Sequence, residues 1–254
     1  MTATTSASRT ARERARAELT REIKQEARRQ LAAHGAQGLS LRAVARELGM
    51  VSSALYRYFP SRDELLTALI IDAYDALGDA AEAADAGRPA ADIRGRWAAT
   101  CHAVMNWALA HPHEYALIYG SPVPGYQAPQ ATVVPAARIA RVAGGLVADA
   151  WREARVAGGG AAPLTPLPPE LAEQAAVVAD AIAPGVPGAV IARLLIAWTQ
   201  LFGMISFELF GQFVGSADPA DAFFGYAVEQ MADFIGLPSR DQGGADSGNG
   251  RAGR

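Results

Sequence analysis

Ala and Leu dominate the apolar half of the sequence, while β-branched residues are scattered through it and rarely alternate with polar ones. A half-buried strand requires that alternation, whereas Ala and Leu favour helices. The residue pattern therefore predicts an all-α fold. A chain of 254 residues is long enough for one large domain or two smaller ones, each with an apolar core.

The net charge of −3 hides an uneven distribution along the chain. Residues 1–62 carry 12 Lys or Arg and 5 Asp or Glu, whereas residues 63–254 carry 11 and 21. A basic N-terminal part joined to an acidic remainder indicates a polyanion-binding head, because cationic side chains release counterions when they meet phosphates. The alternative is that these charges only solvate helix surfaces.

The first 17 residues are predicted to form a flexible basic arm. Residues 1–10 contain six Ser or Thr and no apolar run, so we expect them to be disordered and not a secretory signal. The basic residues of this arm are Arg9, Arg12, Arg14 and Arg16.

Residues 18–62 are predicted to form a domain of three helices. The first has an apolar residue every four positions and ends at Gly35. The second begins after an N-cap at Ser40 and ends at Gly49, and the third is capped by Ser52 and stopped by Pro60. The predicted shared core consists of Ile23, Ala27, Leu31, Leu41, Val44, Leu48, Leu55 and Phe59.

The second and third helices, joined by a tight turn at Gly49, have the pattern of a helix-turn-helix unit. The second helix of such a pair enters the DNA major groove, so its exposed residues, here Ser52, Ser53, Ala54, Arg57 and Tyr56, would face the bases. Arg57 suits the O6 and N7 of guanine, and Ala54 suits a thymine methyl. The groups expected to reach phosphates are those of Tyr56, Tyr58, Arg42 and Arg62. An ordinary helical hairpin, with its tyrosines in packing roles, is the alternative.

The run LSLRAVARELGMVSSALYRYFPSRDELL resembles the DNA-binding signature of the tetracycline-repressor-like (TetR) family of bacterial regulators, and the likeness extends over roughly residues 18–75. Met50-Val51 replaces the commoner Val-Ser, and Arg62 stands where Lys is usual. The resemblance implies a double-stranded DNA operator as partner, no cofactor and a homodimer. It also implies that the DNA-facing positions are Ser40, Arg42, Ser52, Ser53, Ala54, Tyr56, Arg57, Tyr58 and Arg62.

Residues 63–236 are predicted to form a helical domain for effector binding and dimerisation. A fourth helix, with a capping box at Ser61 and Glu64, is expected to run to about Ala84 and to connect the two domains. Further helices are expected near residues 91–111, 112–120, 134–157, 168–182, 187–214 and 219–236. Pro-rich and Gly-rich residues predict loops at 121–135 and 158–169, and residues 237–254 are predicted to be a disordered tail.

The last two long helices are the predicted dimer interface. They hold more aromatic and long apolar residues than one helix face can bury, and such residues are enriched in interface cores. Packing within one chain is the alternative for many of them. Two DNA-reading units on a two-fold axis would also supply the specificity that one unit lacks.

An apolar or aromatic small molecule is the predicted effector. The stretches HPHEYALIYGSPVPGY and AWTQLFGMISFELFG resemble a subgroup whose C-terminal domain is named for a Trp-His-Gly motif, although Phe202 stands where its His is expected. Apolar residues at helical spacing more often pack than bind ligands. The candidate effector-binding residues are Trp97, Cys101, Met105, Tyr115, Ile118, Tyr119, Trp198 and Phe202.

Other classes of protein find less support in the sequence. His111, His113 and Glu114 are interrupted by Pro112 and lack a fourth ligand, so no metal site is predicted. Catalytic nucleophile or phosphate-loop motifs are missing, so an enzyme is not expected. A cytoplasmic location is expected, since no stretch reaches about 20 apolar residues and Cys101 is the single cysteine. A non-specific architectural protein and an activator of the same fold are the remaining alternatives.

Overall fold

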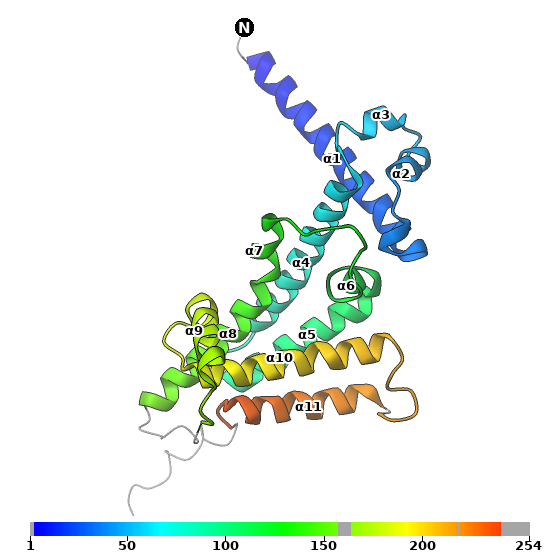
Figure 1. Ribbon diagram of the computed structural model, residues 1–254. Helices are drawn as coiled ribbons and strands as arrows, with labels where there is room; N and C mark the ends of the chain where they lie inside the picture. Colours follow the sequence, from blue (N-terminus) through cyan, green and yellow to red (C-terminus); the bar gives the residue numbers. More distant parts are fainter. Residues whose placement is uncertain (1–2, 157–163, 218, 240–254) are drawn as a thin grey trace, which may run out of the picture. The chain divides into compact units, whose positions relative to one another are not determined.

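The computed structural model describes residues 3–156, 164–217 and 219–239 of the chain. All regular elements among these residues are helices (Figure 1), which confirms the predicted all-α fold. They are α1 (Ala3–His34), η1 (Ala36–Gly38), α2 (Leu41–Glu47), α3 (Ser52–Leu55), α4 (Arg62–Ala86), α5 (Ile93–Ala110), α6 (Pro112–Tyr119), η2 (Gln130–Thr132), α7 (Val133–Ala136), α8 (Arg138–Val156), α9 (Pro169–Ile182), α10 (Gly188–Leu209) and α11 (Ala220–Ile235).

The chain divides into two compact units, and α4 contributes residues to both. The first unit contains residues up to Asp75 together with His111–Pro135, and the second contains Ala76–Ala110 and the residues from Ala136 onward. The sequence predicts that residues 63–236 form one domain. In the structure, however, α6 and the segment after it belong with the N-terminal helices.

The first unit has a continuous apolar core. Of the eight core residues predicted from sequence, seven are buried and Leu48 is half-buried against them. The core also includes side chains from the first half of α4, among them Leu65, Leu66 and Leu69. Four side chains from residues 111–135 pack against it: Leu117, Ile118, Val123 and Tyr126.

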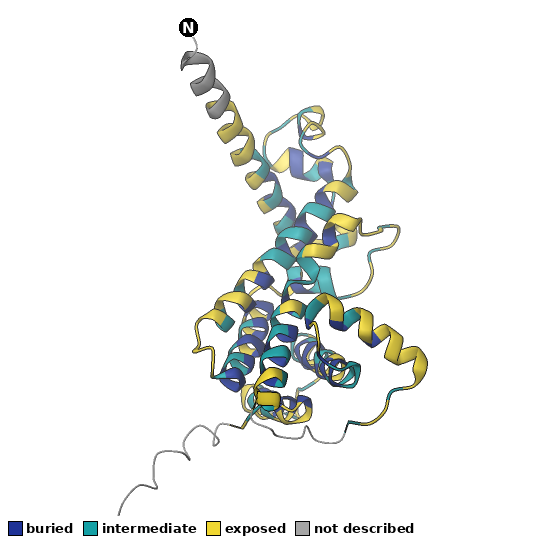
Figure 2. Cartoon of the chain, turned by 90° about the vertical axis from the view of Figure 1, so that its left-hand side faces the viewer, coloured by how far each residue is buried: buried dark blue, intermediate teal, exposed yellow. Residues whose placement is uncertain are grey.

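α1 is longer than the sequence predicts. Residues 3–10 were expected to be disordered, with the helix starting after residue 17, but α1 begins at Ala3. The strong helix formers Ala, Arg and Glu that follow residue 10 outweigh the Ser and Thr residues before it. Residues 11–18 are exposed (Figure 2). Most of the tail predicted at 237–254 lies outside the described residues, and Leu237 is buried.

The second unit is a bundle in which α10 packs against α9 and α11, while α5 packs against α8, α10 and α11. By length and composition α10 could cross a bilayer, but nearly half of its apolar stretch is buried inside the protein, as in a core helix.

Two predicted loops differ from the structure or fall outside it. Residues 130–135 of the predicted 121–135 loop lie in η2 and α7, because a helix tolerates a proline in its first turn better than in its interior. Residues 158–163 of the loop predicted at 158–169 lie outside the described residues.

Candidate nucleic-acid interface

The turn between α2 and α3 is fixed by caps and backbone hydrogen bonds. Ser40 Oγ accepts a hydrogen bond from Ala43 N at 3.4 Å and so caps α2, as predicted. Gly49 has a φ of 64°, a left-handed conformation that favours glycine. Met50 N then donates to Ala45 O at 2.8 Å, which closes the end of α2. The sequence thus builds a rigid elbow between the two helices.

α3 is a single turn that continues into hydrogen-bonded backbone. Val51, not Ser52 as predicted, is the N-cap residue, and no side chain caps the helix. Tyr58 N and Phe59 N both donate to Leu55 O, at 2.8 and 3.1 Å. Buried Leu55 and Phe59 anchor this segment to the core.

The side chains of the α3 segment predicted to face DNA are mostly exposed. Ser52, Ser53 and Arg57 are exposed, and Tyr56 is 41% exposed, while Ala54 is half-buried. On α2, Arg42 is exposed as well. These residues present two hydroxyls, a phenol and two guanidinium groups on one short helical unit. These groups can donate hydrogen bonds both to phosphate oxygens and to base edges.

Tyr58 is half-buried and lies beside α1. The guanidinium of Arg16 lies over the Tyr58 ring, 5.1 Å from its centroid. Arg16 Nη2 also donates to Arg57 O at 3.4 Å. This contact was not predicted from the sequence, because the prediction for residues 1–17 was a flexible arm.

Two of the predicted DNA-facing residues also make contacts inside the first unit. Arg62, at the start of α4, donates through Nη2 to Ala36 O at 2.7 Å and through Nε to Leu39 O at 3.2 Å. Ser40 N donates to Gln30 Oε1 at 3.2 Å. Ser61 Oγ accepts from Glu64 N at 3.1 Å, which is the predicted cap of α4.

An ion-pair cluster ties α1 to α4 and α6. Arg28 donates through Nη2 to Asp72 Oδ2 at 2.7 Å and through Nε to Glu114 Oε1 at 2.8 Å. Lys24 Nζ donates to Asp72 Oδ1 at 2.8 Å. Glu114, considered and rejected as a metal ligand from sequence, therefore takes part in an ion pair. Long-range pairs of this kind carry no local sequence signal.

The eight predicted effector-binding residues do not form one group within either unit. Tyr115, Ile118 and Tyr119 of α6 lie in the first unit with Tyr74, whose hydroxyl donates to Ile118 O at 3.3 Å. Tyr115 is fully buried, and burial raises the pKa of Tyr119. The other five lie in the second unit: Trp97, Cys101, Met105, Trp198 and Phe202.

In the second unit, Trp97, Cys101, Met105 and Phe202 are buried, and burial raises the pKa of the Cys101 thiol. Trp97 Nε1 donates to Val228 O at 3.1 Å, and the ring centroids of Trp198 and Phe202 are 4.6 Å apart. A separate hollow of about 480 Å³, open solvent included, lies among α8, α10 and the end of α11. Its lining includes Trp151 and Arg193 but none of the eight predicted residues.

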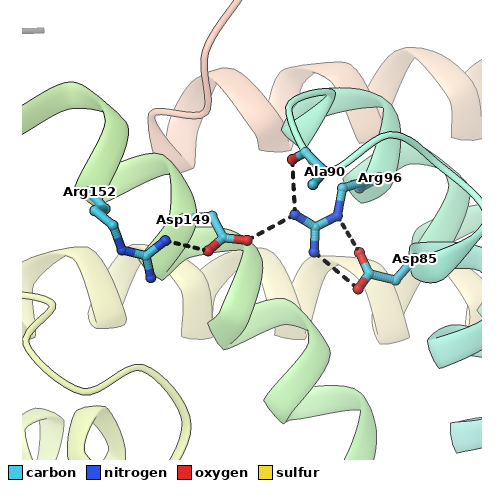
Figure 3. A network of polar contacts seen from close by, with 5 residues as sticks. All are labelled: Asp85, Ala90, Arg96, Asp149 and Arg152. Carbon is cyan, nitrogen blue, oxygen red and sulfur yellow. Dashed lines mark hydrogen bonds and ion pairs between the residues drawn. The ribbon is translucent and has the colours of Figure 1, made fainter. Parts of the chain in front are cut away.

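Arginines fasten the helices of the second unit to one another. Figure 3 shows Arg96 of α5 in a two-bond contact with Asp85 of α4, at 2.8 and 3.1 Å, and 2.8 Å from Asp149 of α8. Arg152 donates to the other oxygen of Asp149 at 2.9 Å. Arg94 makes a similar link from α5 to Glu229 of α11 at 2.7 Å.

The N-terminal and the C-terminal part of the chain each match a family model of the same kind of regulator. Residues 23–69 match the family model described as bacterial regulatory proteins of the tetR family, and residues 97–231 match the tetracyclin repressor-like C-terminal domain. That C-terminal description does not name the Trp-His-Gly subgroup, so the likeness to this subgroup stays a prediction.

A curated relative, HTH-type transcriptional regulator Rv1816 of Mycobacterium tuberculosis, is 41% identical over 215 residues, covering 78% of this chain and 84% of the relative. The solved structure of the regulatory protein SCO4313 is 35% identical with a TM-score of 0.70, covering 87% of this chain and 98% of that one. A protein of unknown function from Rhodococcus sp. RHA1 is 26% identical with a TM-score of 0.62, covering 87% and 96%.

Proposed function

Because the chain belongs to the TetR family of helix-turn-helix transcriptional regulators, we propose that it is a repressor that binds a palindromic operator as a homodimer. The observation that carries this proposal is the α3 segment, which is anchored by buried Leu55 and Phe59 and presents Ser52, Ser53, Tyr56 and Arg57 outward. A rigid backbone with exposed donors is what base reading in a major groove requires.

Within this proposal, Arg57 donates to a guanine, and Ser53 and Ala54 contact neighbouring base edges. Arg42, Tyr56 and Tyr58 hold phosphates and set the register on the duplex. Arg62 and Ser40 contribute by fixing the backbone around α2, since both form hydrogen bonds to protein groups there.

The dimer proposal rests on α10 and α11. Large apolar side chains remain exposed on both helices, with Phe207 52%, Phe223 40% and Tyr226 64% exposed. Phe207 of α10 and Phe210, the C-cap residue of this helix, lie three residues apart. Phe223 and Tyr226 have the same spacing on α11, so each helix carries an apolar stripe. Pairing these stripes with those of a second copy would remove them from water.

The effector is proposed to be a small apolar or aromatic molecule that lowers DNA affinity. Aromatic and sulfur surface in the second unit comes from Trp97, Cys101, Met105, Trp198 and Phe202. Tyr115, Ile118 and Tyr119 lie on α6 in the first unit. α4 contributes to both units, so a ligand that favours one arrangement of the second unit would shift the population of DNA-competent dimers.

We also propose that the protein is cytoplasmic and has no catalytic activity, as is typical of this family.

The test of DNA binding is an anisotropy titration of the full chain on DNA from upstream of its own gene, compared with a shuffled duplex of the same composition. We expect binding to the upstream DNA to be at least about 10³-fold tighter, and expect Arg57→Ala combined with Tyr56→Ala to abolish most of that preference.

The matched control is Arg46→Ala, since Arg46 is exposed on α2 outside the predicted DNA-facing set. This variant should keep the preference. Equal affinity of the wild-type chain for the two duplexes would overturn the proposal. A reporter gene under the upstream DNA should rise in expression when this gene is deleted, whereas a fall would mean activation.

A further inference from the structure

The first part of α1 extends beyond the core of its own unit. Residues 11–18 are exposed, Leu19 is half-buried, and Ile23 is the first buried residue after residue 10. The 16 residues from Ala3 to Glu18 would measure about 24 Å at the rise of an α-helix. Figure 1 shows this part of α1 projecting on the side of the first unit where α3 lies. Residues 11–18 therefore lengthen the helix without adding to the core.

One face of this extension is turned toward the α3 segment. Arg16 lies over the Tyr58 ring and donates to Arg57 O, so its face of α1 borders the residues proposed to meet DNA. Arg12 is one turn earlier, and a spacing of four residues places it on the same face.

The other charges of the extension lie at the edge of this face or on other faces of the helix. At roughly 100° per residue, Arg14 is about 160° around the axis from Arg16, whereas Glu13 is about 60° from Arg16 and about 100° from Arg12, at the edge of the face. Glu18 pairs with Arg21. The face shared by Arg12 and Arg16 is therefore the basic face.

We propose that this extension is an additional DNA-binding element, in which Arg12 contacts the phosphate backbone beside the groove occupied by α3. The inference rests on the proposed function of the α3 segment. A guanidinium beside phosphates gains affinity by releasing counterions, and the contact carries no sequence information. At about 3.4 Å of duplex per base pair, an extension of about 24 Å could follow roughly seven base pairs. Arg16, held against Tyr58, positions the basic face.

The experiment compares Arg12→Gln with Arg14→Gln in the full chain, using a 30-base-pair duplex of arbitrary sequence. The two substitutions remove the same charge from opposite faces, and Gln keeps the helix propensity. Affinity is measured by anisotropy from 50 to 200 mM NaCl. We expect Arg12→Gln to bind about tenfold more weakly at 50 mM NaCl, with a slope of log K against log[salt] shallower by about 1 per protomer. Arg14→Gln should stay within about twofold of wild type.

Equal affinities and slopes for the two variants would overturn the inference, whether both match wild type or both weaken alike. Circular dichroism of each variant checks that the helix content is kept. The duplex contains no operator, so this result is independent of the specific binding tested above. If the chain did not recognise its operator but Arg12→Gln still weakened binding to the arbitrary duplex, only the proposed function would be rejected. If the chain recognised its operator but Arg12→Gln bound like Arg14→Gln, only the proposed DNA contact of the extension would be rejected.

Discussion

Arg62 Nη2 donates a hydrogen bond to Ala36 O at 2.7 Å, and thereby joins the start of α4 to η1. Its Nε donates to Leu39 O at 3.2 Å, so one planar guanidinium satisfies two carbonyls of the segment that leads into α2. The sequence predicts that Arg62 reaches a DNA phosphate, and the family resemblance implies a DNA-facing position. The observed bonds give Arg62 a structural role, in holding the helix-turn-helix backbone, and the DNA contact stays a prediction.

Replacement of Arg62 by Lys tests this structural role. Lys keeps the charge but has no planar fork with which to reach both carbonyls. We expect both Arg62→Lys and Arg62→Ala to lower the free energy of unfolding by about 1 to 2 kcal/mol, as measured by urea denaturation. If Arg62→Lys matched wild-type stability while Arg62→Ala weakened only DNA binding, charge at a phosphate would be the function of this residue.

Substitution of the exposed aromatic residues on α10 and α11 tests the dimer. Phe207→Lys and Tyr226→Lys place charges where the proposed interface would bury apolar rings, so we expect each to shift the protein toward monomer at micromolar concentration. Light scattering after gel filtration gives the mass. Val177→Lys on α9, where Val177 is 71% exposed, is the matched control. An unchanged mass for both aromatic variants would place the interface elsewhere.

The hydroxyl of Thr100 on α5 is a further point of test. Thr100 is 3% exposed, and its Oγ1 has no hydrogen-bond partner among the described residues. A buried hydroxyl without a partner costs free energy. We expect Thr100→Val, which keeps the shape, to raise the free energy of unfolding by about 1 kcal/mol, whereas Thr100→Ser should lower it through loss of the methyl group. A thermal melt that shows Thr100→Val to be destabilised would mean that the hydroxyl is bonded.

The stability contributed by Asp149 should depend on pH. Burial alone would raise its pKa, but hydrogen bonds from Arg96 and Arg152 outweigh this effect and hold the pKa of Asp149 below its ordinary value. Because the folded-state pKa is the lower one, the contribution is complete above the unfolded value near pH 4 and is lost as the pH falls through the folded value.

Asp149→Asn is therefore expected to be less stable than wild type by about 1 to 2 kcal/mol at pH 7. The difference should shrink below about pH 4 in urea titrations. Glu153→Gln, an exposed neighbour on the same helix, should show little difference at either pH. A gap between Asp149→Asn and wild type that persisted unchanged to pH 3 would contradict the assigned ion pairing.

The sequence was most informative where local chemistry determines the structure. Apolar spacing predicted the core of the first unit almost residue by residue, and the caps at Ser40 and Ser61 are where side-chain chemistry placed them. The positive φ at Gly49 likewise follows from local preference. Such features depend on residues within a few positions of one another.

Features that depend on distant residues could not be predicted. The pairing of Arg28 with Asp72 and Glu114 joins segments 44 and 86 positions apart, and no local pattern distinguishes a paired from a solvated arginine. The division of the effector candidates between the two units is of the same kind, since helical spacing does not show which unit a helix joins. The early start of α1 reflects a different error, in which Ser and Thr were given more weight than the helix formers after them.

The packing of residues 111–135 against the helix-turn-helix core has a practical consequence. The DNA-binding module of this chain is discontinuous in sequence, so cutting the chain after Asp75 would uncover the apolar surface beneath Ile118, Val123 and Tyr126 and leave Arg28 without its Glu114 partner. A chimaera that joins this DNA-binding unit to another sensor domain must therefore include two separate segments of the sequence, residues up to 75 and residues 111–135.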